Sequence, residues 1–283
     1  MLDTPHAKSM LDTPVAKRMP REIAPGVFWI GDCLAQRHKG KVYHGYNAAF
    51  LVAGETASCL VETGHPKDFP VIERHMNELF ARGLPPLKYL FVTHQETPHC
   101  GGLGRVLKTF PDALLYGDVS DYHLAFPQYE HRMRSMQEGD EIDLGGRSLM
   151  AVEPVIRDLR TTWWGFDTKE RVLFPGDGFA YSHYHEDGHC GLVAEEAVSL
   201  DLPDVSSTFA DLALFWTKFA DMNVYCDRLD HLIERLDVKV VAPTHGLPIT
   251  DVKNTVPKVQ QGLKAAALMP ESGTNEKVAA PAA

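Results

Sequence analysis

Three side chains that can bind a metal follow one apolar run of the chain. His94, Glu96 and His99 lie in the segment 93–102, directly after the apolar residues 89–92 and just before a pair of glycines. Imidazole and carboxylate groups together are ligands of zinc and of iron. The alternative is a surface loop that holds two histidines and a glutamate. If the apolar run is a buried strand of an α/β protein, its carboxyl end is where active sites gather, which favours a metal centre.

Two later segments also place a polar side chain next to glycine after an apolar run. Asp177 stands in the sequence Pro-Gly-Asp-Gly, which follows the apolar residues 172–174. His245 stands in the sequence Pro-Thr-His-Gly, which follows the apolar residues 238–242. Glu62 and His65 come after a further apolar run, where they could orient ligands through hydrogen bonds.

Apolar spacing predicts the elements that position these residues. Runs without polar alternation predict buried strands, whereas apolar residues three and four apart predict helices. Paired glycines at 145–146 predict a tight β-hairpin. The expected strands are 26–31, 47–52, 59–62, 87–93, 113–116, 149–155, 161–166, 171–174 and 238–242, and the expected helices are 68–82, 103–110, 207–222, 224–236 and 251–267.

Composition and charge exclude several classes of protein. The formal charge of -10, without a cluster of Lys and Arg, argues against nucleic acid as a partner. No run approaches the roughly 18 apolar residues of a membrane helix. Five cysteines without a Cys-x-x-Cys pair favour a reducing compartment, so we expect a cytoplasmic protein. We expect one domain at 22–266 between a mobile tail at 1–21, which holds a near-duplicated octapeptide, and a disordered tail at 267–283.

The order of these pieces resembles the metallo-β-lactamase superfamily, whose α/β fold is a four-layered αβ/βα sandwich. The resemblance rests on the histidine-rich loop, the Phe-Pro-Gly-Asp loop and the final Pro-Thr-His-Gly, and it covers residues 22–266. Within that superfamily, the sequence is most similar to the diiron domain of flavodiiron and oxygen-binding diiron proteins. Glu96 and the segment 139–147 carry that closer likeness. Hydrolases of the superfamily usually have a second histidine where this chain has Glu96.

The resemblance implies a ligand set for two metal ions. It places His94 and Glu96 on a first metal and His99 and His245 on a second, with Asp177 bridging both. Two positions depart from the family pattern. Pro98 stands where an aspartate is expected and cannot bind metal. A further histidine is replaced by Arg157 or Asp158, depending on how the chain is counted, and we favour Asp158 because an unpaired buried arginine beside two cations is costly.

This ligand set implies two divalent metal ions, zinc or iron, and leaves three functions open. We expect a metallohydrolase in which a metal-bound hydroxide attacks a small, aromatic ester, lactone or ether. One alternative is a diiron protein that binds or activates dioxygen without a flavin domain. The other is a metal-poor subunit without catalysis.

Aromatic and histidine side chains further along the chain are candidates for a substrate site. Trp163, Trp164, Tyr181 and Trp216 could line a pocket beside the metals, with core packing as the alternative. His183 and His185, shortly after Asp177, are candidate catalytic proton donors or replacement ligands. We expect a small-molecule substrate and a homo- or hetero-oligomer.

Overall fold

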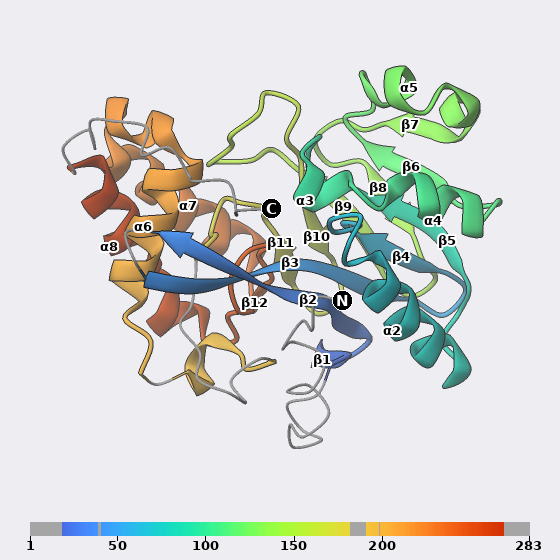
Figure 1. The fold of residues 1–283 in the computed structure, drawn as a ribbon, viewed down its shortest axis with the longest axis horizontal. Coiled ribbons are helices and arrows are strands. Elements are labelled where there is room, and N and C mark those ends of the chain that lie inside the picture. Colours follow the sequence, from blue (N-terminus) through green and yellow to red (C-terminus); the bar gives the residue numbers. More distant parts are fainter. Residues whose placement is uncertain (1–18, 39–40, 182–190, 198, 269–283) are drawn as a thin grey trace, which may run out of the picture.

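The computed structural model describes residues 19–38, 41–181, 191–197 and 199–268. Two sheets stand face to face, and helices cover the outer face of each, as Figure 1 shows. The first sheet has the order β1-β2-β3-β4-β5-β6-β7 and the second the order β12-β11-β10-β9-β8. The predicted α/β sandwich of the metallo-β-lactamase type is therefore confirmed.

Seven strands form the first sheet, and three neighbours in it are parallel. Strand β4 pairs with β5, and β5 with β6, in parallel. Their carboxyl ends therefore lie along one edge. The strands are β1 (Arg21–Ala24), β2 (Val27–His38), β3 (Lys41–Ala53), β4 (Ser58–Val61), β5 (Leu87–Phe91), β6 (Leu114–Gly117) and β7 (Met133–Ser135).

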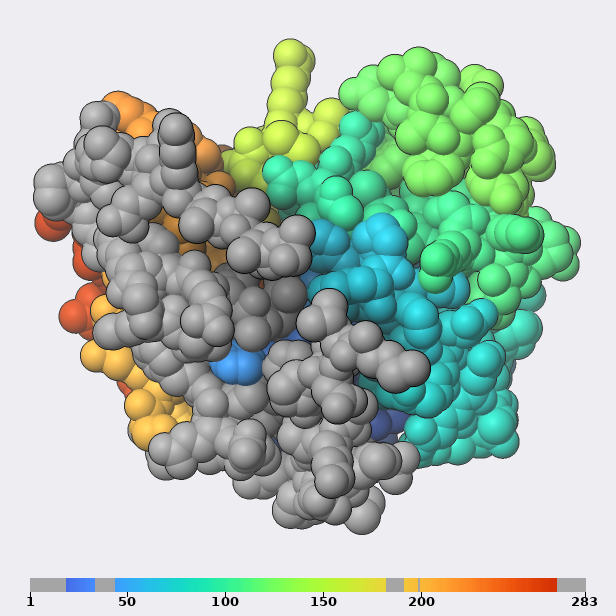
Figure 2. Space-filling view, in the orientation of Figure 1, coloured from blue at the N-terminus to red at the C-terminus, as the bar shows by residue number. Residues whose placement is uncertain are grey.

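The second sheet has one parallel pair, β11 with β12, at its end. Its other strands are antiparallel, and the predicted glycine hairpin joins β8 to β9. The strands are β8 (Glu141–Asp143), β9 (Ser148–Val152), β10 (Trp164–Asp167), β11 (Val172–Phe174) and β12 (Val240–Val241). The loop that follows β9 protrudes between the two outer helical layers, where it is yellow-green in Figures 1 and 2.

Helices cover the sheets from both sides because each has one apolar face. Apolar residues of α2 such as Phe69, Ile72 and Leu79 are buried in the core beside the first sheet. The core between the sheets includes Phe50 and Phe174, whose ring centroids are 5.4 Å apart. The α-helices are α2 (Phe69–Ala81), α3 (Thr97–Cys100), α4 (Leu103–Thr109), α5 (Tyr122–Ala125), α6 (Leu202–Ala213), α7 (Met222–Leu236) and α8 (Val252–Ala267), and the 3-10 helices are η2 (Pro127–Arg132), η3 (Ala194–Glu196) and η4 (Phe215–Phe219).

The structure departs from the expected elements at several places, including the bounds of β2 and α6. The strand expected at 26–31 continues to His38 and pairs with β3 along its whole length. The helix expected at 207–222 begins earlier, at Leu202, and ends at Ala213. Asp201 caps it by accepting a hydrogen bond from the Asp204 backbone, and a proline in its first turn suits that position.

Other predictions are tested less directly. Most of the predicted tails, 1–18 and 269–283, lies outside the described residues, so the domain limits stay predictions. In the part of the chain that the structure describes, no helix is long and apolar enough to span a membrane.

Candidate metal centre

Four residues that follow strands bring the candidate ligands together. His94 lies beyond the carboxyl end of β5, and His99 lies in the short helix α3 that follows. Asp177 follows β11 and His245 follows β12, so these two come from the second sheet. The structure thus places all four beyond the carboxyl ends of parallel strands, where ligands gather in α/β proteins.

The donor atoms of this cluster are close enough to share metal ions. One atom each from His94, Glu96, His99 and Asp177 lie within 4.8 Å of one another. Asp177 stands in the middle with its two oxygens directed differently. Its Oδ1 is 3.3 Å from His99 Nε2 and 3.5 Å from His245 Nε2, whereas its Oδ2 is 4.0 Å from His94 Nε2. With its oxygens placed in this way, Asp177 could contact two cations, as the sequence predicts.

Asp158 joins the His94 side of the cluster, and Arg157 does not. Asp158 Oδ2 is 3.3 Å from His94 Nε2, while its Oδ1 accepts a hydrogen bond from the Leu159 backbone at 2.9 Å. Arg157 instead pairs with Glu153. Of the two alternatives that the sequence left open, the structure brings Asp158 to the centre.

Within the described residues, several buried polar atoms of the cluster have no hydrogen-bond partner, and they are the atoms a metal would bind. They are His94 Nε2, His99 Nε2 and Asp177 Oδ1. The three residues are 1%, 0% and 5% exposed. Leaving buried polar atoms unsatisfied costs about 1–3 kcal/mol each. Cations between these atoms would remove that cost, so the donor set fits a metal centre.

The other ring nitrogens are held by neighbours, which fixes the tautomers. His245 Nδ1 donates to the Tyr46 carbonyl at 2.5 Å, and His99 Nδ1 is 3.1 Å from Glu62 Oε1. His94 Nδ1 is 3.0 Å from the Thr93 hydroxyl, which itself donates to Glu62. Each Nε2 is thereby left with its lone pair directed into the cluster, as a metal ligand requires.

Glu62 organises this shell from an unusual backbone position. It is 1% exposed, and its φ of 63° is rare for a residue other than glycine. The predicted orienting role of Glu62 agrees with its contacts to His99 and Thr93. Its partner in that prediction, His65, has a pKa lowered mainly by burial, and no bond between His65 and a ligand is seen among the described contacts.

The protonation states of Asp177 and His245 suit metal binding. Burial raises the pKa of Asp177, but the imidazoles of His99 and His245 outweigh it and hold that pKa well below its usual value. Burial lowers the pKa of His245, although Asp177 opposes the shift. Burial also lowers the pKa of His99, yet Asp177 and Glu62 raise it overall. Asp177 is therefore anionic and His245 neutral, as metal ligands must be, whereas His99 would release a proton.

Gly176 allows the Asp177 loop to approach the His94 loop. Its φ is +55°, and a Cβ there would lie 2.7 Å from the Thr93 hydroxyl. The carbonyl of Gly176 also accepts a hydrogen bond from Thr244, which ties this loop to the His245 loop. A side chain at this position would separate the ligands of the two sheets.

The predicted pocket residues lie mainly in the core. Trp164 and Tyr181 are fully buried, and Trp216 packs against Tyr225 with ring centroids 5.0 Å apart. Trp163 is partly buried, and its backbone donates to Thr93. These contacts match the packing alternative for Trp164 and Tyr181, and a substrate pocket lined by the four stays a prediction. His183 and His185 lie outside the described residues.

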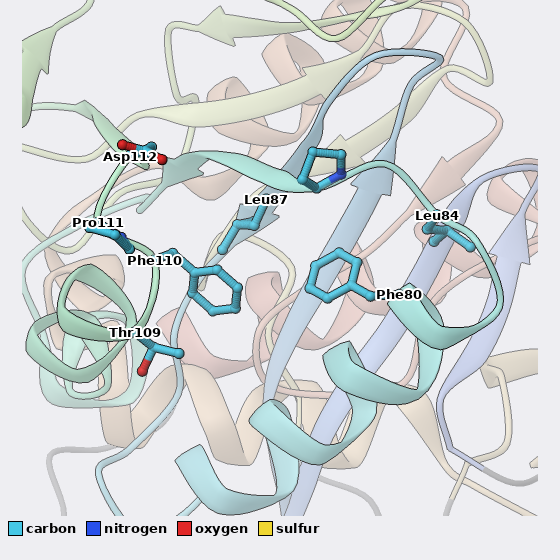
Figure 3. A pocket seen from close by; sticks show the side chains of 8 residues that line it. Phe80, Leu84, Leu87, Thr109, Phe110, Pro111 and Asp112 are labelled. Carbon is cyan, nitrogen blue, oxygen red and sulfur yellow. The ribbon is translucent and has the colours of Figure 1, made fainter.

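An apolar cavity of about 430 Å³ occurs at the opposite end of β5 from the metal loop. Figure 3 shows Phe80 from α2 and Phe110 from the segment after α4 facing each other across it. Leu87, the first residue of β5, also lines it. None of its lining residues belongs to the metal cluster, so it is not the predicted substrate pocket.

The comparisons with known proteins agree with this geometry. Residues 46–246 match the family described as ODP family beta lactamase, and this range contains every ligand candidate. The chain belongs to this family. The ODP family match confirms the predicted resemblance, and the flavodiiron protein of Giardia intestinalis has a similar fold, with a TM-score of 0.66 and 16% identity over 87% of this chain and 58% of that one.

Two curated relatives that match most of this ODP-family chain are oxidoreductases by name. Coenzyme F420H(2) oxidase of Methanocaldococcus jannaschii is 23% identical over 84% of this chain. Nitric oxide reductase of Moorella thermoacetica is 24% identical over 81%. The chain spans 59% and 57% of the length of these two relatives.

The prediction of a hydrolase is therefore wrong. The two relatives just named, which match over four fifths of the chain, are an oxidase and a reductase, and neither name describes hydrolysis. The prediction failed because imidazole and carboxylate donors occur both in zinc sites that generate hydroxide and in redox-active iron sites. The prediction of an enzyme with a metal cofactor is confirmed, and the metal-poor alternative loses its support.

Proposed function

We propose that this chain is a diiron oxidoreductase domain that reduces a small diatomic oxidant, dioxygen or nitric oxide. The observation that carries the proposal is Glu96 in the cluster with His94, His99 and Asp177. A carboxylate at this position adds an anionic oxygen donor that suits iron, where hydrolases of the superfamily usually place an imidazole. The names of the relatives support both oxidants.

The chain would hold the two irons in the arrangement that the distances suggest. His94, Glu96 and Asp158 would bind the first, and His99 and His245 the second, with Asp177 between them. When bound, the irons supply electrons to the oxidant and positive charge that stabilises its reduced form. Glu62, Thr93 and Tyr46 keep the imidazole lone pairs directed at the irons.

Reducing equivalents must reach this centre from a donor. We propose that a redox partner or domain outside residues 46–246 supplies them, since the relatives are considerably longer than the matched region. His183 and His185 remain candidate proton donors. An oligomeric assembly and a cytoplasmic location also stay predictions.

Metal content and gas consumption test the proposal together. The chain is reconstituted with ferrous iron without oxygen, its metals are counted, and consumption of oxygen or nitric oxide is followed with an artificial electron donor. We expect two irons per chain and steady consumption of at least one gas. Asp177→Asn should abolish consumption, whereas Glu141→Gln, an exposed acid in β8, should not. Consumption of neither gas by a fully iron-loaded chain would refute the proposal.

A further inference from the structure

The two halves of the metal centre differ in their ligands. We propose that the His94 half binds its metal more tightly, and that the His99 half is the weaker site with open positions for the small-molecule substrate. This rests on the ligand set given under the proposed function, but not on the reaction. The departures at Pro98 and Asp158 together create the difference.

The His94 half is rich in anionic oxygen. Glu96, Asp158 and Asp177 Oδ2 face His94 there, so one imidazole meets three carboxylates. Asp158 is well fixed for this role, because its Oδ1 also lies 3.4 Å from the Thr162 hydroxyl and its side chain is only 11% exposed. Its Oδ2 is left to face the centre. Affinity for hard cations rises with the number of anionic ligands.

Glu96 also contributes a carboxylate to this half. It stands at the N-cap of α3, but its side chain makes no capping hydrogen bond. Glu96 and Asp158 both lie near His94, so their negative charges would repel each other when no cation is present. A cation in the His94 half would relieve that repulsion.

Among the residues that the structure describes, the His99 half has fewer ligands. His99 and His245 face Asp177 Oδ1, which gives two imidazoles and one shared carboxylate. Pro98, in the first turn of α3, offers no donor atom. Glu62 contacts the other ring nitrogen of His99, so its carboxylate holds the ring rather than the metal. Two histidines and one carboxylate leave coordination positions open, as in the iron sites that bind oxygen in other folds.

Graded removal of metal tests the inference without measuring activity. Iron-loaded protein is dialysed against increasing chelator, and the iron that stays bound is counted. We expect a plateau at about one iron per chain, with about a tenfold or larger difference in chelator concentration between the two steps. Mössbauer spectra of protein loaded with ⁵⁷Fe should show two unequal signals, of which one disappears first.

Variants assign the steps to the two halves. Pro98→Asp supplies the missing carboxylate and should move the loss of the first iron to higher chelator. Asp158→Asn should abolish the plateau, and Asp158→His should narrow the gap between the steps while keeping a ligand. Glu153→Gln, an acid in the same loop that pairs with Arg157, serves as the matched control. Circular dichroism of each metal-free variant checks folding.

Each outcome bears on one claim. The proposal of two sites with unequal affinity would be overturned if both irons left the wild-type chain together. It would also be overturned if the Asp158→Asn protein kept the plateau. A clear plateau in a chain that consumes neither gas would support unequal sites and refute only the proposed reaction. Unchanged steps in Pro98→Asp would overturn the assignment of the weaker site to His99.

Discussion

The Glu62 side chain directly follows β4 and contacts groups on two other segments, the one after β5 and the one after β12. It faces His99 Nδ1 at 3.1 Å, accepts from the Thr93 hydroxyl, and accepts from the Thr244 hydroxyl at 3.3 Å. These contacts fix one imidazole directly and a second through Thr93. A residue that binds no metal thus sets the direction of two ligands.

At this scale we predict that Glu62→Gln weakens metal binding. The amide carries no charge and accepts less strongly from His99, so that ring is less well oriented. Loss of such a partner lowers metal affinity about 10- to 100-fold. Competition with a metal-binding dye measures the affinity. Glu55→Gln, on an exposed turn, should bind metal as the wild type does, and equal affinities for both variants would contradict the orienting role of Glu62.

Among the elements, helix α8 depends on a carboxylate from another segment. Glu195 in η3 accepts hydrogen bonds from the backbones of Thr250 and Asp251 and from the hydroxyls of Thr250 and Thr255. The two backbone donors lie at the start of α8, where the N–H groups of a helix lack partners within the helix. Burial opposes ionisation of Glu195, but the bonds from Asp251 and Thr250 lower its pKa overall.

The lowered pKa of Glu195 predicts a pH-dependent contribution to stability. The contribution is present above the unfolded pKa, near 4.5, and is lost as pH falls through the lower folded pKa. Glu195→Gln should therefore reduce the free energy of unfolding by about 1 kcal/mol at pH 7, and the difference should fade below about pH 4. Urea denaturation at several pH values measures it. A difference that stays constant down to about pH 3 would contradict a charge-based role, and Glu141→Gln is the control.

The turn between β3 and β4 packs tightly on the hairpin between β8 and β9. A Cβ at Gly54 would lie 2.1 Å from the Leu144 carbonyl oxygen, and the backbones of Glu55 and Thr56 donate to that hairpin. This contact joins the two sheets at one end.

Gly54→Ala should therefore destabilise the chain. The added methyl group meets backbone, which cannot move away as a flexible side chain could, so we expect a loss of about 1–3 kcal/mol. Thermal unfolding measures it. Glu55→Ala, which alters the exposed neighbour, should change stability by less than about 0.5 kcal/mol. Equal midpoints for Gly54→Ala and the wild type would show that the turn relaxes.

For the whole molecule, the metal centre is a second junction between the sheets. His94 and His99 come from the first sheet, and Asp177 and His245 from the second. Metal ions bound by these residues would therefore hold the sheets together and would bind the unfolded chain poorly.

Iron should consequently raise the midpoint of thermal unfolding. At about 100 times the dissociation constant the stabilisation is about 2.7 kcal/mol, or roughly 5–10 °C for a domain of this size. Scanning calorimetry with and without iron measures the shift. Asp177→Ala should lose most of it, because Asp177 faces the histidines of both halves, while Glu141→Gln keeps it. An undiminished shift in Asp177→Ala would show that Asp177 does not take part in metal binding.

Sequence alone determined the local features of this protein. The apolar runs at 87–93 and 171–174 contain strands, and the candidate metal-binding loops follow them. These features are predictable because the spacing of buried residues and the glycine turns depend on residues that are neighbours in the sequence. The extension of β2 to His38 was not predictable in this way, since strand pairing rather than apolar pattern sets its length. The early start of α6 depends on the Asp201 cap, a short signal within a segment that lacks periodicity.

Only the tertiary structure decided how the ligands group. Asp158 and Arg157 are neighbours in the chain, and the path of the loop after β9 is what turns Asp158 toward His94. The Tyr46 carbonyl that orients His245 comes from β3, distant in sequence, and no local pattern marks it. The motif at 93–102 therefore predicted a metal centre by itself. The division of that centre into an oxygen-rich and a nitrogen-rich half arises from contacts between the two sheets.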